Sequence, residues 1–150
     1  MRVWIYQSSR RFSVEEQNII QQKLSSFVEV WNAHGKSLAA KAELRHGLFI
    51  ILGVDEKQVP PSGCSIDSSV HFLKGLESEF GVSLFDRFQL AYRDQGEIKV
   101  AARQEFEQLV QAGLITPDTI VFNNMVTEEA ALLNEWEIPF KKSWHAKVFN

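Results

Sequence analysis

The spacing of apolar residues changes several times along the chain, and these changes predict alternating strands and helices. Val3–Tyr6 is a short apolar run of β-branched and aromatic residues, which is typical of a strand. After a capping box of Ser13 and Glu16, apolar residues recur at intervals of three and four, which predicts a helix that ends near Gly35. The apolar stripe of this helix is formed by Ile20, Leu24, Phe27, Val28 and Trp31.

The next segment changes to the alternating pattern of a strand. Apolar and polar residues alternate over Leu38–Arg45, which predicts a strand with one solvated face. A turn at His46-Gly47 leads into Leu48–Leu52, whose unbroken apolar run predicts a strand covered on both faces. After a polar connection with two prolines, a second helix is expected from about Ser65, and Gly81 ends it.

The last part of the chain predicts shorter elements. Leu84–Tyr92 is expected to form a fourth strand, followed by a hairpin turn at Asp94-Gln95-Gly96. The remaining expected elements are a fifth strand at Glu97–Val100, a third helix around Phe106 that stops at Gly113, a sixth strand at Thr119–Phe122, and a short helix from Thr127 to Trp136. An aromatic tail follows them.

The order of these elements predicts the fold class. Residues 1–92 run strand, helix, strand, strand, helix, strand, which is the order of the ferredoxin-like split βαβ arrangement. In that arrangement the first two strands are parallel, and the third lies between them. We therefore expect an α+β fold with a ferredoxin-like core and additional C-terminal strands and helices. A length of 150 residues, 45% of them hydrophobic, predicts one domain over residues 1–150.

Composition and charge exclude several classes of function. The net charge of −3 and the pI of about 5.8 provide no basic surface, so general nucleic-acid binding is not expected. Cys64 is the single cysteine, which fits a reducing compartment. The sequence shows no signal-peptide pattern and no apolar run that could cross a bilayer. We therefore expect a cytoplasmic protein that does not act at a membrane.

The predicted strand order brings several polar segments to one edge of the sheet. The end of the first helix, the loop before the second helix and the turn around Arg93 are expected to meet there. Cys64 would directly precede the second helix, whose free amide groups favour the thiolate form, and His34 would be its base. The candidate catalytic residues are Cys64, His34 and Asp67, and the candidate binding residues are Ser62, Gly63, Ser65, Lys36 and Arg93.

Simpler interpretations of the same residues remain open. A lone cysteine is more often a small buried hydrophobic residue, and the segment around it can be only a turn and a helix cap. Asp67 and His71 can form an intrahelical pair, and His145 is a second candidate base. Arg10 and Arg11 offer another anion site, or are simply solvated. The histidines and the cysteine lack the spacing of zinc ligands, so neither a metal ion nor a cofactor is expected.

Several segments together resemble a family of small, uncharacterised bacterial proteins over nearly the whole chain. These segments are Trp4–Ser8, Trp31–Gly35, Ser62–Asp67, Val121–Asn124 and Ser143–His145. Members of the family often carry the label "ABC transporter ATPase", but the sequence contains no Gly-x-x-x-x-Gly-Lys-Ser/Thr loop to hold a nucleoside triphosphate. The resemblance implies a bacterial cytoplasmic protein and supplies no catalytic residue.

Two functions follow from these observations. The favoured one is a binding or interaction module for a small molecule or a protein, which includes the formation of a homodimer. The alternative is a small cysteine-dependent enzyme or thiol sensor that uses Cys64 with His34 as base.

Overall fold

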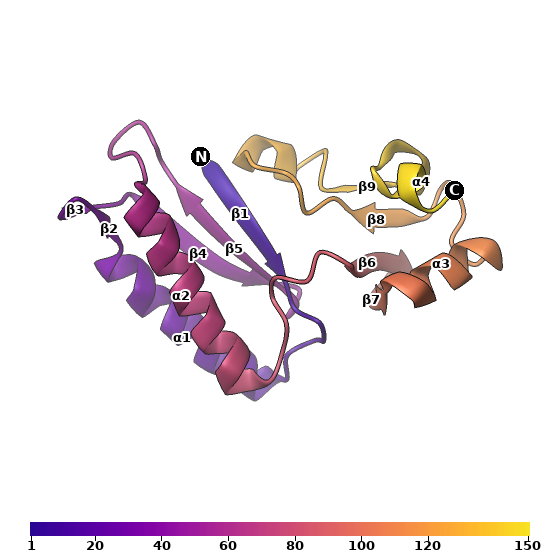
Figure 1. Cartoon of the computed structure of the whole chain (residues 1–150), viewed down its shortest axis with the longest axis horizontal. Coiled ribbons are helices and arrows are strands. Elements are labelled where there is room, and N and C mark those ends of the chain that lie inside the picture. The colour runs from indigo at the N-terminus through magenta and orange to yellow at the C-terminus, as the bar shows by residue number, and fades with distance from the viewer. The chain divides into compact units, whose positions relative to one another are not determined.

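The computed structural model describes all residues, Met1–Asn150, and its helices and antiparallel sheets confirm the α+β class. The residues form two compact units (Figure 1). Unit 1 consists of Met1–Phe85 and Thr127–Glu129, and unit 2 consists of Asp86–Val126 and Ala130–Asn150. The expectation of one domain over residues 1–150 stays a prediction.

Unit 1 contains a three-stranded sheet in the order β1-β5-β4. Its strands are β1 (Arg2–Gln7), β5 (Phe49–Val54) and β4 (Ala40–Arg45). Because β5 is antiparallel to both neighbours, β1 and β4 run parallel with β5 between them, as the sequence predicts. Every residue of β5 is buried, which confirms that the unbroken apolar run is covered on both faces.

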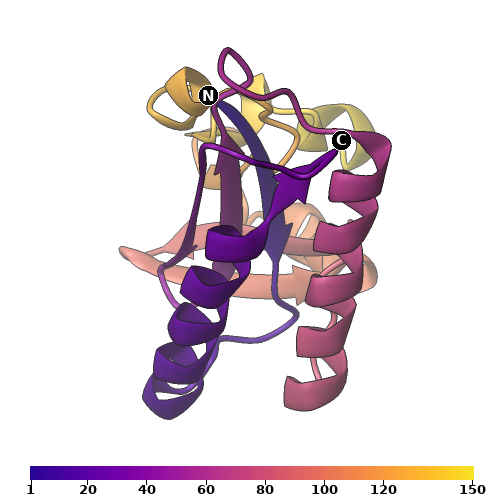
Figure 2. The same ribbon diagram turned by 90° about the vertical axis from the view of Figure 1, so that its left-hand side faces the viewer.

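The helices α1 (Val14–Val30) and α2 (Gly63–Phe80) lie side by side on one face of this sheet (Figure 2). Phe27 of α1 stacks on Phe72 of α2, with ring centroids 4.5 Å apart. The buried core beneath the two helices includes Ile20, Leu24, Ile50, Leu52, Leu73 and Leu76. The apolar stripe predicted for the first helix therefore contributes to this core.

The first helix ends earlier than predicted. Gly35 does not cap α1, because the chain turns to an extended conformation at Trp31, whose side chain is buried in the core. A small hairpin follows, formed by β2 (Asn32–Ala33) and β3 (Lys36–Ser37). Gly35 occupies the turn of this hairpin together with His34, and both residues have positive φ angles, 79° and 52°.

The ferredoxin-like order of four strands is not formed within the sheet of unit 1. Leu84–Tyr92 was expected to supply the fourth strand, but the strand there, β6 (Gln89–Asp94), belongs to the sheet of unit 2. The outer edge of β1 is instead occupied by Thr127–Glu129. The Val3 amide donates to the Thr127 carbonyl at 2.8 Å, and the Glu129 amide donates to the Met1 carbonyl at 2.8 Å. A segment distant in sequence thus pairs with β1, and the predicted fourth strand does not join this sheet.

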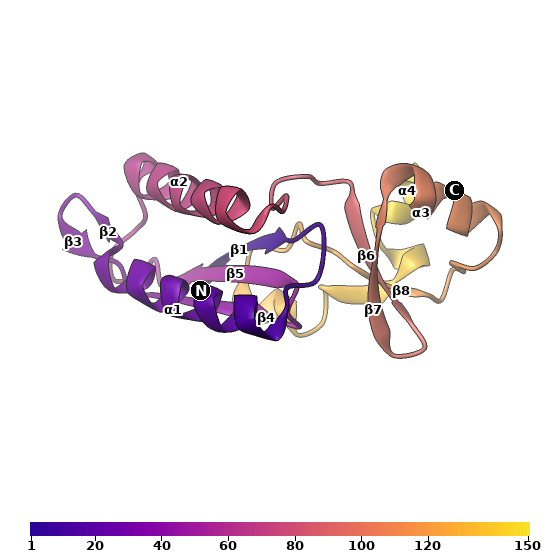
Figure 3. The same cartoon turned by 90° about the horizontal axis from the view of Figure 1, so that it is seen from below.

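Unit 2 contains a four-stranded sheet in the order β7-β6-β8-β9 (Figure 1). Figure 3 shows its strands β6, β7 and β8 from another side. The other strands are β7 (Glu97–Ala102), β8 (Ile120–Phe122) and β9 (Glu137–Pro139). The hairpin between β6 and β7 turns at Gln95 and Gly96, as predicted.

The helices of unit 2 are short. They are α3 (Arg103–Gln111), η2 (Phe140–Lys142) and α4 (His145–Val148). The helix predicted for Thr127–Trp136 is reduced to η1 (Glu129–Leu132), whose first residue still belongs to unit 1. Phe106 of α3 is fully buried, and Phe140 and Phe149 of the aromatic tail pack against it. None of the helices in the chain combines the length and the apolar character needed to cross a lipid bilayer.

Candidate functional site

The candidate thiol lies in the first turn of α2, and not ahead of the helix. Ser62 caps the helix: its Oγ accepts from the Ser65 amide at 3.1 Å, and Ser65 Oγ accepts from the Ser62 amide at 2.7 Å. This is a capping box with serine at the position usually held by Glu or Gln. Two serines three residues apart are the sequence signal for it. The hydroxyl groups of Ser62 and Ser65, expected to bind a ligand, are therefore used within the helix start, and the side chain of Ser65 is buried.

The side chain of Cys64 is exposed. Its exposure excludes the interpretation that it is a small core residue. Cys64 and Gly63 are the first two helical residues after the cap, and amide groups at these positions have no carbonyl acceptor within the helix. No hydrogen bond joins the Cys64 sulfur to His34, to Asp67 or to any other group.

One buried hydrogen bond holds the hairpin β2-β3 beside the start of α2. Trp31 Nε1 donates to the carbonyl oxygen of Ser65 at 2.8 Å, and the Trp31 ring packs on Phe27 with centroids 5.1 Å apart. Because Trp31 directly precedes β2, this bond positions the hairpin against the first turn of α2. The structure therefore brings together the end of the first helix and the start of the second, as the strand order predicts. The spacing of apolar residues contains no signal for this bond.

We name the surface formed by Asn32–Ser37 and Ser62–Asp67 the loop edge. The Asn32 side chain accepts a hydrogen bond from the Gly35 amide at 3.3 Å, which stabilises the turn of the hairpin. The exposed side chains of the loop edge include Asn32, His34, Lys36, Cys64 and Asp67. The surface therefore offers a carboxylate, an ammonium group, an imidazole and a thiol on a backbone that is fixed by hydrogen bonds.

Two other predicted contacts are not formed as expected. Asp67 and His71 are both exposed, and no ion pair or hydrogen bond joins them. Arg93, predicted to reach the same sheet edge on the fourth strand, lies on β6 in unit 2. There its guanidinium group donates to the Glu137 carboxylate and to the Gly96 carbonyl, and it lies 5.6 Å from the ring centroid of Phe122.

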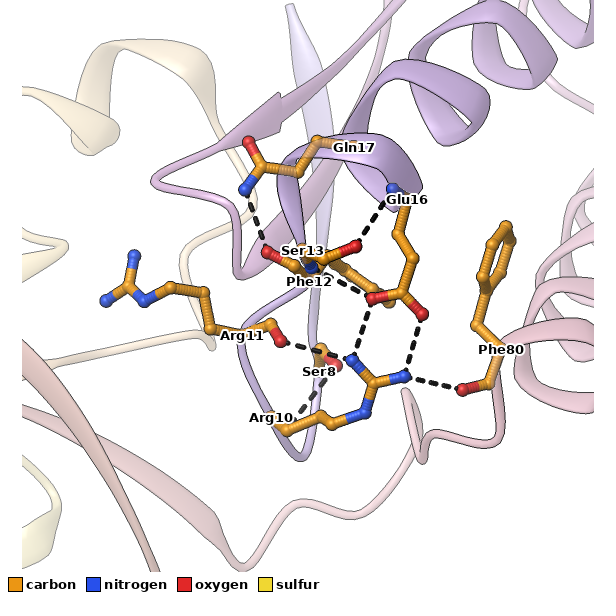
Figure 4. A network of polar contacts seen from close by, with 8 residues as sticks. All are labelled: Ser8, Arg10, Arg11, Phe12, Ser13, Glu16, Gln17 and Phe80. Atoms are coloured by element: carbon orange, nitrogen blue, oxygen red, sulfur yellow. Dashed lines mark hydrogen bonds and ion pairs between the residues drawn. The ribbon is translucent and has the colours of Figure 1, made fainter.

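The two arginines ahead of α1 take part in structural contacts (Figure 4). The Arg10 guanidinium donates to both carboxylate oxygens of Glu16 at 2.9 Å, and to the Phe80 carbonyl at the end of α2 at 2.8 Å. Arg11 donates to the His46 carbonyl at 2.6 Å. The hydrogen bonds from Arg10 lower the pKa of Glu16 to about 2. This cluster ties the start of α1 to the end of α2, and Arg10 is not free to bind an anion.

His145 lies in the core of unit 2 and not on an open surface. Its ring stacks on Trp144, with centroids 3.9 Å apart, and its Nδ1 lies 3.1 Å from Ser143 Oγ. Burial lowers the pKa of His145 to about 4, so the ring is neutral at pH 7. A side chain packed in this way is not accessible as a general base for a substrate.

The structure contains no further candidate for a metal or catalytic centre. Nowhere in the chain do three or more His, Cys, Asp or Glu side chains gather as a metal site would require. The loop edge is therefore the surface on which a proposal of function rests. Comparison of the chain with protein-family models, with curated proteins and with solved structures gives no match.

Proposed function

We propose that the protein is a binding or interaction module whose recognition surface is the loop edge of unit 1. The observation that carries this proposal is the 2.8 Å hydrogen bond between Trp31 and Ser65, because it fixes two exposed polar segments against each other. Surfaces that are held in place before binding lose less conformational entropy when a partner binds. His34, Lys36 and Asp67 supply hydrogen-bonding and charged groups of both signs on this frame.

The distribution of groups favours binding over catalysis. A nucleophilic cysteine is usually activated by a base within hydrogen-bonding distance, and no such contact joins Cys64 to His34. The loop edge exposes side chains of both charges, Lys36 and Asp67, which suits a partner that also presents polar groups of both signs. We therefore propose a protein partner, which includes a second copy of this chain.

The natural thiol provides the probe for the test. The full chain is labelled at Cys64 with a maleimide photo-crosslinker and irradiated in a lysate of the source cells, and the adducts are identified by mass spectrometry. The matched control carries Cys64→Ser and Ser78→Cys, which moves the thiol to an exposed position near the other end of the same helix. We expect a discrete adduct from Cys64 that weakens in Lys36→Ala and is absent from the control. Equal adducts from both thiol positions would contradict the proposal.

A second candidate function is favoured by the exposure of Cys64, namely a small cysteine-dependent enzyme or a thiol sensor. The free amide groups at a helix start can donate hydrogen bonds to an anion formed during a reaction there. We expect the Cys64 thiol to react with iodoacetamide at neutral pH faster than the Ser78→Cys thiol. A rate that falls in His34→Ala would support an enzyme, and an unchanged rate would support a sensor. A rate no faster than that of the reference thiol would exclude both.

The single cysteine also bears on where the protein is located. An exposed single thiol is kept reduced in the cytoplasm, so we propose a cytoplasmic location.

The sheet of unit 1 bears on the fold type. The order β1-β5-β4 with both helices on one face suits a split βαβ core in which Thr127–Glu129 takes the place of the fourth strand.

A further inference from the structure

The contacts of Ser143 determine which nitrogen of His145 carries the hydrogen. Ser143 Oγ donates its single proton to the Phe140 carbonyl at 2.8 Å and accepts from the His145 amide at 3.2 Å. Its 3.1 Å contact with His145 Nδ1 therefore requires Nδ1 to be the donor. The unprotonated nitrogen of the neutral ring is Nε2, and no protein group is hydrogen-bonded to it.

His145 is one of two aromatic anchors that hold the end of the chain in unit 2. Its side chain is 1% exposed, and its ring centroid lies 5.7 Å from that of Phe106. Phe149, the second anchor, is also buried, and its ring centroid lies 4.9 Å from that of Phe106. The segment Ser143–Asn150 thus covers Phe106 through these two rings, while its own hydrogen bonds are those of a single short turn.

No carboxylate compensates a positive charge on this ring. The charged side chains on the elements packed around it are Lys141 and Lys142 of η2, Lys147 of α4, and Arg103, Glu105 and Glu107 of α3. All of them are exposed, and none is hydrogen-bonded to the ring. The face of the Trp144 ring can also interact with a cation. Burial disfavours the charged form of the ring and lowers the pKa of His145 to about 4.

We propose that His145 is an acid-sensitive latch, in which uptake of a proton at Nε2 releases Ser143–Asn150 from the core of unit 2. The step takes one proton from the solvent, and no other covalent bond changes. The released ring binds a proton near the ordinary histidine value of 6.5, whereas the packed ring does so only near 4. Between these values, each decrease of one pH unit therefore raises the ratio of released to packed segment by up to about tenfold. Release uncovers the apolar side chains of Phe106 and Phe140.

Hydrogen exchange of the full chain tests the latch. Exchange of residues 143–150 is measured by mass spectrometry between about pH 7 and pH 4.5, corrected for the intrinsic pH dependence of the rate. In wild type we expect the protection factors of these residues to decrease by up to roughly 100-fold between pH 7 and pH 4.5, while the amides of β6 and β7 stay protected. In His145→Asn, which keeps an N–H donor for Ser143 but does not titrate, protection should not change with pH.

Three results would overturn the latch: protection of the segment in wild type down to about pH 4.5, a parallel loss in His145→Asn, or a loss that includes all of unit 2 at once. If His145→Asn does not fold, wild type alone gives the answer. The ring-proton NMR signal of His145 must then titrate together with the exposure of residues 143–150. Titration of the ring in a segment that stays protected would contradict the proposal.

Discussion

Trp31 Nε1 lies 2.8 Å from the carbonyl oxygen of Ser65, so the residue that follows α1 is hydrogen-bonded to the first turn of α2. The two residues are 34 positions apart, and both are buried. Because the hairpin β2-β3 begins immediately after Trp31, this contact determines where His34 and Lys36 lie relative to the start of α2. It links the stability of unit 1 to the shape of the loop edge.

Substitution of Trp31 by phenylalanine should weaken unit 1. The variant loses the buried hydrogen bond and part of the ring volume, and we expect a loss of about 1–2 kcal/mol in the free energy of unfolding. Urea denaturation followed by circular dichroism measures it. The control is Trp4→Phe, since Trp4 packs against Trp31 at 6.2 Å but its indole nitrogen makes no hydrogen bond. A loss no larger than that of the control would show that the bond contributes little.

The capping box of α2 gives a second prediction. Ser62→Ala removes the acceptor for the Ser65 amide, and we expect a cost of about 1 kcal/mol, in the usual range for an N-cap serine. Ser68→Ala is the control, because Ser68 is an exposed residue of the same helix and makes no hydrogen bond through its side chain. The same urea titration compares them. Equal stabilities of the two variants would contradict the assignment of the cap.

The ion pair of Arg10 and Glu16 predicts a pH dependence. The pKa of Glu16 is lowered from 4.5 to about 2, so the unfolded chain binds a proton at this carboxylate more readily than the folded chain does. Its stabilising contribution is therefore complete above about pH 4.5 and is lost as the pH falls toward 2. We expect Glu16→Gln to be less stable than wild type at neutral pH, and the difference to shrink on acidification.

Urea midpoints measured over a pH series test this prediction. Glu15→Gln serves as the control, since Glu15 lies in the same helical turn and its exposed carboxylate makes no ion pair. A difference between wild type and Glu16→Gln that is constant over the acidic range would rule out the ion pair as its source.

Phe106 is the centre of the aromatic core of unit 2. It is fully buried and contacts Tyr92, Phe140 and Phe149. Phe106→Ala should cost about 3–5 kcal/mol and abolish the resolved NMR signals of β6 and β7. Phe88→Ala, at an exposed ring in the same unit, should cost less than about 1 kcal/mol. Retention of the unit 2 signals in Phe106→Ala would show that this core tolerates the cavity.

The features that could be predicted from the sequence are those with local causes. Ser13 and Glu16 mark the start of α1 because their side chains and amide groups satisfy one another directly. Gly81 ends α2 in the left-handed conformation, with φ at 63°, as a residue without a side chain can do. The apolar run of β5 reports burial on both faces without reference to any particular partner.

The features that sequence reasoning missed depend on distant partners or on helix phase. Nothing near Val3 indicates that Thr127 pairs with it, and Leu84–Tyr92 was instead expected to add a fourth strand to this sheet. At the candidate site, the helix begins at Gly63 and not at about Ser65, so Cys64 is itself a helical residue and its side chain points about 100° away from that of Ser65. Ser65 is the buried one and Cys64 the exposed one. The distance between Cys64 and any base depends on this tertiary context.

The pairing of Thr127–Glu129 with β1 also has a consequence for synthesis on the ribosome. Residues of unit 2 both precede and follow this short segment, so the chain returns to its first strand only after most of unit 2 has been translated. Until then the backbone groups along the edge of β1 have no partner, and an unpaired strand edge is prone to aggregation. A nascent chain arrested before Thr127 should therefore depend on a chaperone. Extension of the arrested chain to include Thr127–Glu129 should relieve that dependence.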